Sequence, residues 1–217
     1  MNSGLFDEEF ALADAANAAT QARQKQTQRS AAIARKASAL VLRRATSEAE
    51  LARLLPPILA QETSYHIMSS GDIDALSYLR HIVTGMPIDR LTLSTWCMNL
   101  DDAQWLFAMQ DAGKLDHIRL YFGEIMPGTY PDVYEYVHAM ERAGRCQMTI
   151  ARNHSKIMLG YNEPNDAAYV IESSANVNTN PRFEQTAIHT TRPLLEFYEE
   201  FFAHVQCIDK RQRLAKP

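Results

Sequence analysis

Residues 147–172, which read QMTIARNHSKIMLGYNEPNDAAYVIE, decide the fold. They contain strand-like runs at 147–151, 156–161 and 168–172, and no helical pattern separates these runs. The turn residues Asn162-Glu-Pro-Asn-Asp166 lie between the second run and the third. Consecutive strands joined by turns form a β-meander. We therefore expect a meander at one end of a sheet.

The chain before this stretch alternates between strand and helix patterns. Strands are expected at 65–70, 90–96 and 117–122, and helices at 73–86, 100–112 and 131–143. Asn99 or Asp101 caps the second helix, and Gly144 stops the third. A last amphipathic helix opens at Pro193 and must pack on the sheet. Alternation of this kind predicts an α/β protein with helices on the sheet faces.

The N-terminal part has a different composition. Residues 17–32 hold no apolar side chain larger than alanine, so they cannot bury a face of their own. Ser47 and Glu50 form a predicted capping box for a helix that ends at Pro56-Pro57. We expect a basic helical arm at 1–57, a folded domain at 58–207 and a basic tail at 208–217.

The overall composition excludes several classes of protein. With 46% hydrophobic and 22% charged residues, the chain has the balance of a globular domain. Its mean hydropathy is −0.30 and no apolar stretch approaches the roughly 20 residues of a membrane helix. The acidic start lacks the features of a signal peptide, and Cys97, Cys146 and Cys207 form no paired motif. We expect a cytoplasmic protein.

The charge is unevenly distributed. Residues 15–46 contain no acidic residue, although the whole chain has a net charge of −4. A basic segment beside an acidic body can bind nucleic-acid phosphates, but it can equally be a solvated helix face. The basic residues of this segment are Arg23, Lys25, Arg29, Arg35, Lys36, Arg43 and Arg44.

Candidate catalytic residues cluster in the last third of the chain. His154-Ser-Lys156 opens a predicted strand, so that alternation directs both side chains to one face. Ser174-Ala-Asn176 ends the next strand, and Glu184 follows. A lone histidine on a strand is more often structural. The catalytic interpretation therefore depends on the combination of His154 with the Ser174-Ala-Asn176 motif and Glu184.

The order of these motifs resembles that of the phospholipase D superfamily, in particular its short single-motif members of the Nuc endonuclease type. The resemblance is carried by His154-Ser-Lys-Ile-Met-Leu-Gly160, Tyr169–Asn176 and Asn180-Pro-Arg-Phe-Glu184. It covers about residues 60–206 and implies a mixed sheet flanked by helices on both faces. Two positions depart from the family pattern: Tyr161 replaces an aspartate, and Ser173 replaces a glycine.

The chemistry of phosphodiester cleavage gives each residue a role. A neutral imidazole can attack phosphorus if a carboxylate on its other nitrogen fixes the tautomer, which fits His154 and Glu184. An ammonium and an amide can stabilise the non-bridging oxygens without a metal or another cofactor, which fits Lys156 and Asn176. Ser174 is an auxiliary donor to the substrate.

The leaving oxygen also needs a proton donor, for which the natural group is a second histidine. No second HxK motif occurs in this chain. A homodimer that brings two copies of His154 to one phosphate supplies it, as the resemblance implies. The expected activity is that of a metal-independent nuclease that acts on DNA in preference to RNA.

Other interpretations remain open from the sequence. The protein can be a catalytically silent DNA- or protein-binding relative or, with less support, a lipid-cleaving enzyme. The carboxylates of two acidic pairs suit helix starts better than a metal site. Several histidines and aromatic residues fit packing better than catalysis or base stacking. These residues are Asp72, Asp74, Asp101, Asp102, His66, His81, Trp96, Trp105, Tyr121 and Phe122.

Overall fold

The computed structural model describes residues 43, 46–178 and 181–209. The fold described below is that of the unit Thr46–Pro217. The proposed nucleic-acid contacts Arg23, Lys25, Arg29, Arg35 and Lys36 lie outside the described residues, as do residues 210–217 of the tail.

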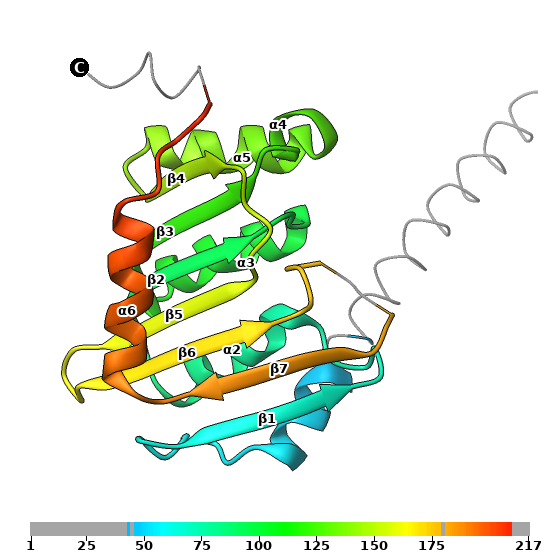
Figure 1. Cartoon of the computed structure of the whole chain (residues 1–217), viewed down its shortest axis with the longest axis vertical. Coiled ribbons are helices and arrows are strands. Elements are labelled where there is room, and N and C mark those ends of the chain that lie inside the picture. The colour runs from blue at the N-terminus through cyan, green and yellow to red at the C-terminus, as the bar shows by residue number, and fades with distance from the viewer. Residues whose placement is uncertain (1–42, 44–45, 179–180, 210–217) are drawn as a thin grey trace, which may run out of the picture. The chain divides into compact units, whose positions relative to one another are not determined.

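A mixed seven-stranded sheet forms the centre of this unit, in the order β1-β7-β6-β5-β2-β3-β4. The strands β2, β3 and β4 are parallel to one another, whereas β5, β6, β7 and β1 pair antiparallel. β5 also pairs antiparallel with β2 and so joins the two halves (Figure 1). The bounds are β1 Ser64–Ser69, β2 Ile88–Thr95, β3 Leu115–Gly123, β4 Cys146–Ala151, β5 Ile157–Asn162, β6 Ala167–Ser173 and β7 Glu184–His189.

Helices cover both faces of the sheet. Helices α2 (Ala75–Gly85), α3 (Leu100–Asp111) and α5 (Pro131–Arg142) pack on one face through the larger core cluster. A short helix, α4 (Met126–Thr129), precedes α5. Helix α6 (Arg192–Ala203) crosses the opposite face and buries Leu195 and Phe202 against β5 and β6 (Figure 1). This confirms the expected α/β class, a mixed sheet with helices on both faces.

The expected meander differs from the observed one. The run at 147–151 forms β4 at the far edge of the sheet, and β2 and β3 lie between it and β5. The antiparallel meander consists instead of β5, β6 and β7. β4 extends the parallel half because α5 returns the chain alongside β3. β7 was not anticipated, since Glu184-Gln-Thr-Ala-Ile-His189 contains one large aliphatic residue.

The folded unit begins earlier than residue 58. Residues 46–54 are helical, and Leu51, Leu55 and Leu59 are buried in the main core. The predicted capping box of Ser47 and Glu50 is wrong. The Ser47 hydroxyl is buried and donates to the carbonyl of Asp72, 2.7 Å away, while it accepts the amide N–H of Asp74. Ser47 therefore ties this helix to the segment before α2.

The acidic pairs near helix starts make local contacts. The Asn99 side chain caps α3 by accepting the Asp102 amide N–H at 2.8 Å, and its Nδ2 donates to the Asp102 carboxylate. Asp102 also forms an ion pair with Arg80 at 3.2 Å. Asp72 accepts the amide N–H of Ser70. Asp74 occupies the N-cap position of α2 without a side-chain capping hydrogen bond, and Asp101 and Asp102 lie in the first turn of α3, where a negative charge suits the helix dipole.

Candidate active site

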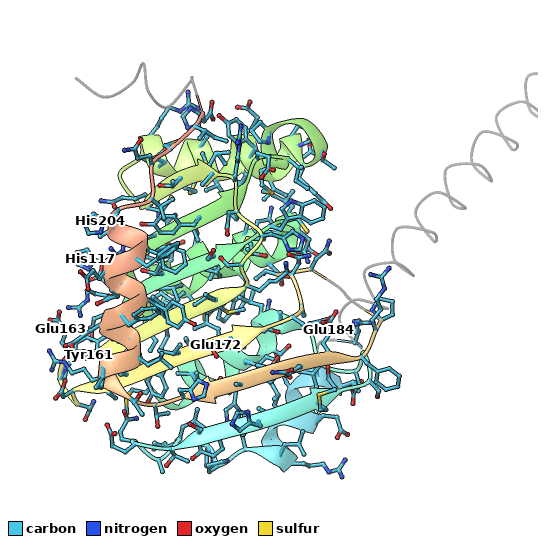
Figure 2. All side chains as sticks on the ribbon, in the orientation of Figure 1. His117, Tyr161, Glu163, Glu172, Glu184 and His204 are labelled. Atoms are coloured by element: carbon cyan, nitrogen blue, oxygen red, sulfur yellow. The ribbon has the colours of Figure 1, made fainter. Side chains whose placement is uncertain are left out.

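The candidate catalytic residues come from separate segments that meet at one edge of the sheet. His154 and Lys156 lie in the connection that enters β5, Ser174 and Asn176 follow β6, and Glu184 begins β7. Antiparallel pairing places the start of β5, the end of β6 and the start of β7 side by side. Figure 2 shows Glu184 at this edge, at the end of the sheet away from Tyr161.

His154 and Lys156 are in direct contact. Lys156 Nζ lies 2.9 Å from His154 Nδ1 and donates to the His154 carbonyl at 2.5 Å. The two side chains therefore lie together, although residues 153–156 precede β5 and strand alternation does not produce the contact. An ammonium has only donors, so Nδ1 is the accepting nitrogen in this state and Nε2 carries the ring proton. The His154 ring also packs against Trp96, with 5.1 Å between centroids. Trp96 is thus both a core-packing and a site residue.

The electrostatic environment of Lys156 lowers the pKa of its ammonium from the ordinary value, because burial disfavours the charged form. Cys97 and Glu184 act in the opposite direction and raise this pKa. Lys156 is therefore poised to gain more from an anionic ligand than an exposed lysine would, since a phosphate oxygen replaces the lost solvation of the ammonium.

Ser174 and Glu184 form a pair beside this lysine. The Ser174 hydroxyl donates to the Glu184 carboxylate and accepts the Gln185 amide N–H at 3.0 Å. Glu184 is buried at the first position of β7. The sequence analysis assigned Glu184 to the second imidazole nitrogen, but Lys156 lies at His154 Nδ1 in this state. The carboxylate begins β7, two strands from β5 in the sheet, and its charge acts on Lys156.

Asn176 lies in the segment that follows β6. This segment is attached to the end of β2 through Val177. The Val177 amide donates to Thr95 Oγ1 at 3.1 Å, and Val177 forms a parallel bridge with Met98. Asn176 Oδ1 lies 3.5 Å from Thr95 Oγ1. The carbonyl end of the amide thus faces β2, which directs the Nδ2 donor away from the strand.

Sequence reasoning missed the residues that hold the HxK segment. Asn153 Nδ2 donates to Ser94 Oγ at 2.9 Å and to the Tyr121 carbonyl at 3.0 Å. Asn153 Oδ1 accepts both the amide and the hydroxyl of Ser155, at 3.0 and 2.7 Å. The only sequence signal was the position of Asn153 directly before His154, because the partners lie on distant strands.

The two departures from the family pattern have local explanations. Tyr161 lies five residues beyond Lys156 on β5, a separation of about 17 Å at the usual strand rise. Its hydroxyl donates to Asp166 at 2.6 Å, and the guanidinium of Arg90 stacks on its ring, 4.5 Å from the centroid. Ser173 Oγ accepts the Ala175 amide and lies 2.9 Å from Thr186 Oγ1. Tyr161 therefore belongs to the α6 end of the sheet, remote from His154.

The described residues contain no group of three or more His, Cys, Asp or Glu side chains placed to hold a metal ion. Within the same part of the chain, no helix has the length and apolar character needed to cross a membrane.

Comparison with known proteins gives a likeness of fold. No family model and no curated protein matches the chain. The archaeal chromatin protein TrmBL2 is similar in structure, with a TM-score of 0.50 and 8% identity over 90% of this chain and 71% of that protein. This likeness shows the fold alone.

Two enzymes of the phospholipase D superfamily are also similar, each with a TM-score of 0.47. Polyphosphate kinase from Porphyromonas gingivalis is 13% identical over 64% of this chain. Phosphatidylserine synthase from Haemophilus influenzae is 12% identical over 64% of this chain. The chain spans 25% of the kinase and 37% of the synthase, and these likenesses carry no argument about activity.

Proposed function

We propose that the protein is a metal-independent phosphodiesterase that cleaves nucleic acid, DNA in preference to RNA, through a covalent phosphohistidine at His154. One observation carries this proposal: an exposed imidazole, an ammonium, a serine–carboxylate pair and an amide converge from three segments at one edge of the sheet. These groups match the demands of phosphoryl transfer, namely a nucleophile and donors for the non-bridging oxygens.

The reaction proceeds in two displacements. First, His154 Nε2 attacks phosphorus; the N–P bond forms, the P–O bond to the leaving oxygen breaks, and that oxygen takes a proton. Then water attacks phosphorus, the P–N bond breaks, and the water proton passes to a base. Binding of the phosphate draws the Lys156 ammonium from His154 Nδ1 to a non-bridging oxygen. The imidazole can then hold its proton on Nδ1, with Glu184 as the expected stabilising carboxylate.

The leaving oxygen receives its proton from His154 of a second copy of the chain. In-line displacement places nucleophile and acid on opposite sides of phosphorus, and the chain has one HxK motif. A two-fold homodimer with a shared site meets this requirement. Wild-type activity should then fall with the square of the wild-type fraction when subunits exchange with His154→Ala. A linear fall would place the proton donor within one chain.

The decisive test is incubation of the purified protein with labelled DNA, labelled RNA and a generic phosphodiester in excess EDTA. Cleavage should persist under chelation and disappear in His154→Ala. A strict Mg²⁺ requirement, or full activity of the His154 variant, would refute the proposed mechanism. The relative rates on the DNA and RNA substrates test the preference for DNA.

The basic arm is proposed to bind the polymer. Deletion of residues 1–45 preserves residues 46–55, which include the core residues Leu51 and Leu55, so the shortened protein should fold. Its affinity for duplex DNA should fall, and the salt slope should become shallower by about 0.9 for each phosphate contact removed. An unchanged slope would show that the arm makes no phosphate contacts.

A second candidate is a catalytically silent DNA-binding protein of the same fold. The likeness to TrmBL2, described as a chromatin protein with a novel mode of DNA binding, favours it. DNA binding without cleavage of any substrate in the EDTA experiment or with added divalent metal would support this candidate over the enzyme.

A further inference from the structure

Two adjacent hydroxyl residues, Ser94 and Thr95, end strand β2 between the two catalytic segments. Both are fully buried, with 0% of their surface exposed. Successive side chains of a strand point to opposite faces of a sheet, so the two hydroxyls act on opposite sides of β2. This arrangement allows one dipeptide to contact two different loops.

Ser94 holds the segment that contains His154. Its hydroxyl accepts Asn153 Nδ2 at 2.9 Å and lies 2.7 Å from Ser155 Oγ. These contacts are made by the residues on either side of His154, so they fix the backbone that carries the imidazole. Asn153 extends the same attachment to the end of β3 through the Tyr121 carbonyl.

Thr95 holds the segment that contains Asn176. Its hydroxyl accepts the Val177 amide at 3.1 Å and donates to the Cys97 carbonyl at 2.8 Å. The Asn99 amide donates to the Val177 carbonyl at 3.3 Å, which adds a second attachment of this segment to the residues after β2. The Thr95 hydroxyl is thus central to a small buried network.

We propose that Ser94 and Thr95 are positioning residues that set the separation between the His154 nucleophile and the Asn176 donor. The inference rests on the proposed function and concerns how the same site is organised. Neither hydroxyl reaches solvent, so neither acts on substrate; each acts through the loop that it holds. A displacement of about 1 Å in reacting geometry can cost roughly 10²-fold in rate.

Strand β2 itself offers a matched control. Thr92 lies three residues before Thr95, is 1% exposed, and its Oγ1 has no hydrogen-bond partner among the described residues. Thr92→Val and Thr95→Val therefore make the same chemical change in equally buried positions of one strand. Thr95→Val leaves the Val177 amide without its acceptor, whereas Thr92→Val removes a hydroxyl that holds nothing.

The first readout is steady-state cleavage of a DNA substrate in EDTA. Ser94→Ala and Thr95→Val should lower kcat by about 10–100-fold with little change in KM, because the loss lies in alignment. Thr95→Ser keeps the hydroxyl and should recover most of kcat, and Thr92→Val should match wild type. Equal effects of the two valine variants, or no recovery in Thr95→Ser, would overturn the inference.

The second readout is amide hydrogen exchange of the full chain, which needs no activity. Exchange should quicken in residues 152–156 for Ser94→Ala, in residues 174–178 for Thr95→Val, and in neither for Thr92→Val. If this local exchange pattern is observed but the wild-type protein cleaves no substrate, the proposed phosphodiesterase activity is refuted. The attachment of the two loops by Ser94 and Thr95 is then still supported. Normal cleavage without the local pattern would refute the positioning role alone.

Discussion

The two ends of strand β5 differ in what their side chains do. At its start, Lys156 contacts the exposed imidazole of His154, and the neighbouring loops are held by buried hydroxyls. At its end, the guanidinium groups of Arg90 and Arg192 both contact the Tyr161 ring, and the Tyr161 hydroxyl donates to Asp166. The first end leaves reactive groups open to a ligand, whereas the second joins the sheet to α6.

This difference separates the position of Tyr161 from the candidate catalytic groups. Tyr161, which stands where the superfamily pattern has an aspartate, belongs to the cluster that includes Leu195 and Phe202 of α6. It packs and pairs at the stabilising end of β5. Substitutions at the two ends should therefore separate activity from stability.

The largest effect is expected for His154→Ala. Cleavage in EDTA should fall to the uncatalysed level, because no other group can form the covalent intermediate. Thermal unfolding should remain close to that of wild type, since the imidazole is exposed. Retention of measurable turnover by this variant would remove the functional distinction between the two ends.

Lys156→Ala and Asn176→Ala should each lower kcat by about 10²–10³-fold, as expected for loss of one preorganised donor. Asn165→Ala is a matched control for the amide, because Asn165 lies in the turn at the opposite end of β5 and bonds to Asn162. Its kcat should equal that of wild type. Similar losses in the two asparagine variants would show that the amide effect is not local to the site.

The pH profile should respond to Glu184→Gln. Burial lowers the pKa of Lys156, and the nearby Glu184 carboxylate partly opposes this shift. Removal of the Glu184 charge should therefore lower the Lys156 pKa further and move the alkaline fall in kcat to lower pH. The measurement is kcat against pH for wild type and variant, and a shift to higher pH would contradict the assignment of Lys156 as the required cation.

The smallest effect is expected for Tyr161→Phe, which keeps the ring beneath Arg90 and removes the hydroxyl bonded to Asp166. The melting temperature should fall slightly while kcat stays unchanged. Tyr161→Asp, which introduces the family residue, should lower stability more, because it removes an aromatic ring from the α6 cluster, and should not raise kcat. An increase in cleavage would connect this end of β5 to the chemistry.

Local patterns predicted most of the fold. Apolar periodicity and turn residues located the helices and most strands, and Asn99 was a correct helix cap. The sheet order was not predictable from those patterns, since β4 and β5 are consecutive in sequence but separated by two strands. Strand β7 was missed because alternating polar residues and a single isoleucine gave no apolar run.

The candidate site was predictable only in part. The HxK motif and the Ser-x-Asn motif are each a short run of adjacent residues, so each can be found in the sequence. The structure brings the two motifs to one edge of the sheet. The residues that hold them, Ser94, Thr95 and Asn153, make contacts across roughly 60 to 80 residues of chain. Hydroxyl and amide side chains are common at strand ends, so only the assembled sheet reveals these partnerships.

The most direct test of the central claim is detection of the covalent intermediate. Wild-type protein is mixed with a DNA substrate in excess EDTA, quenched in alkali, which preserves phosphohistidine, and digested for mass spectrometry. The account predicts a nucleotidyl phosphate adduct on His154 that forms and decays during turnover and is absent from His154→Ala. Cleavage without an adduct on His154, or an adduct on another residue, would contradict it.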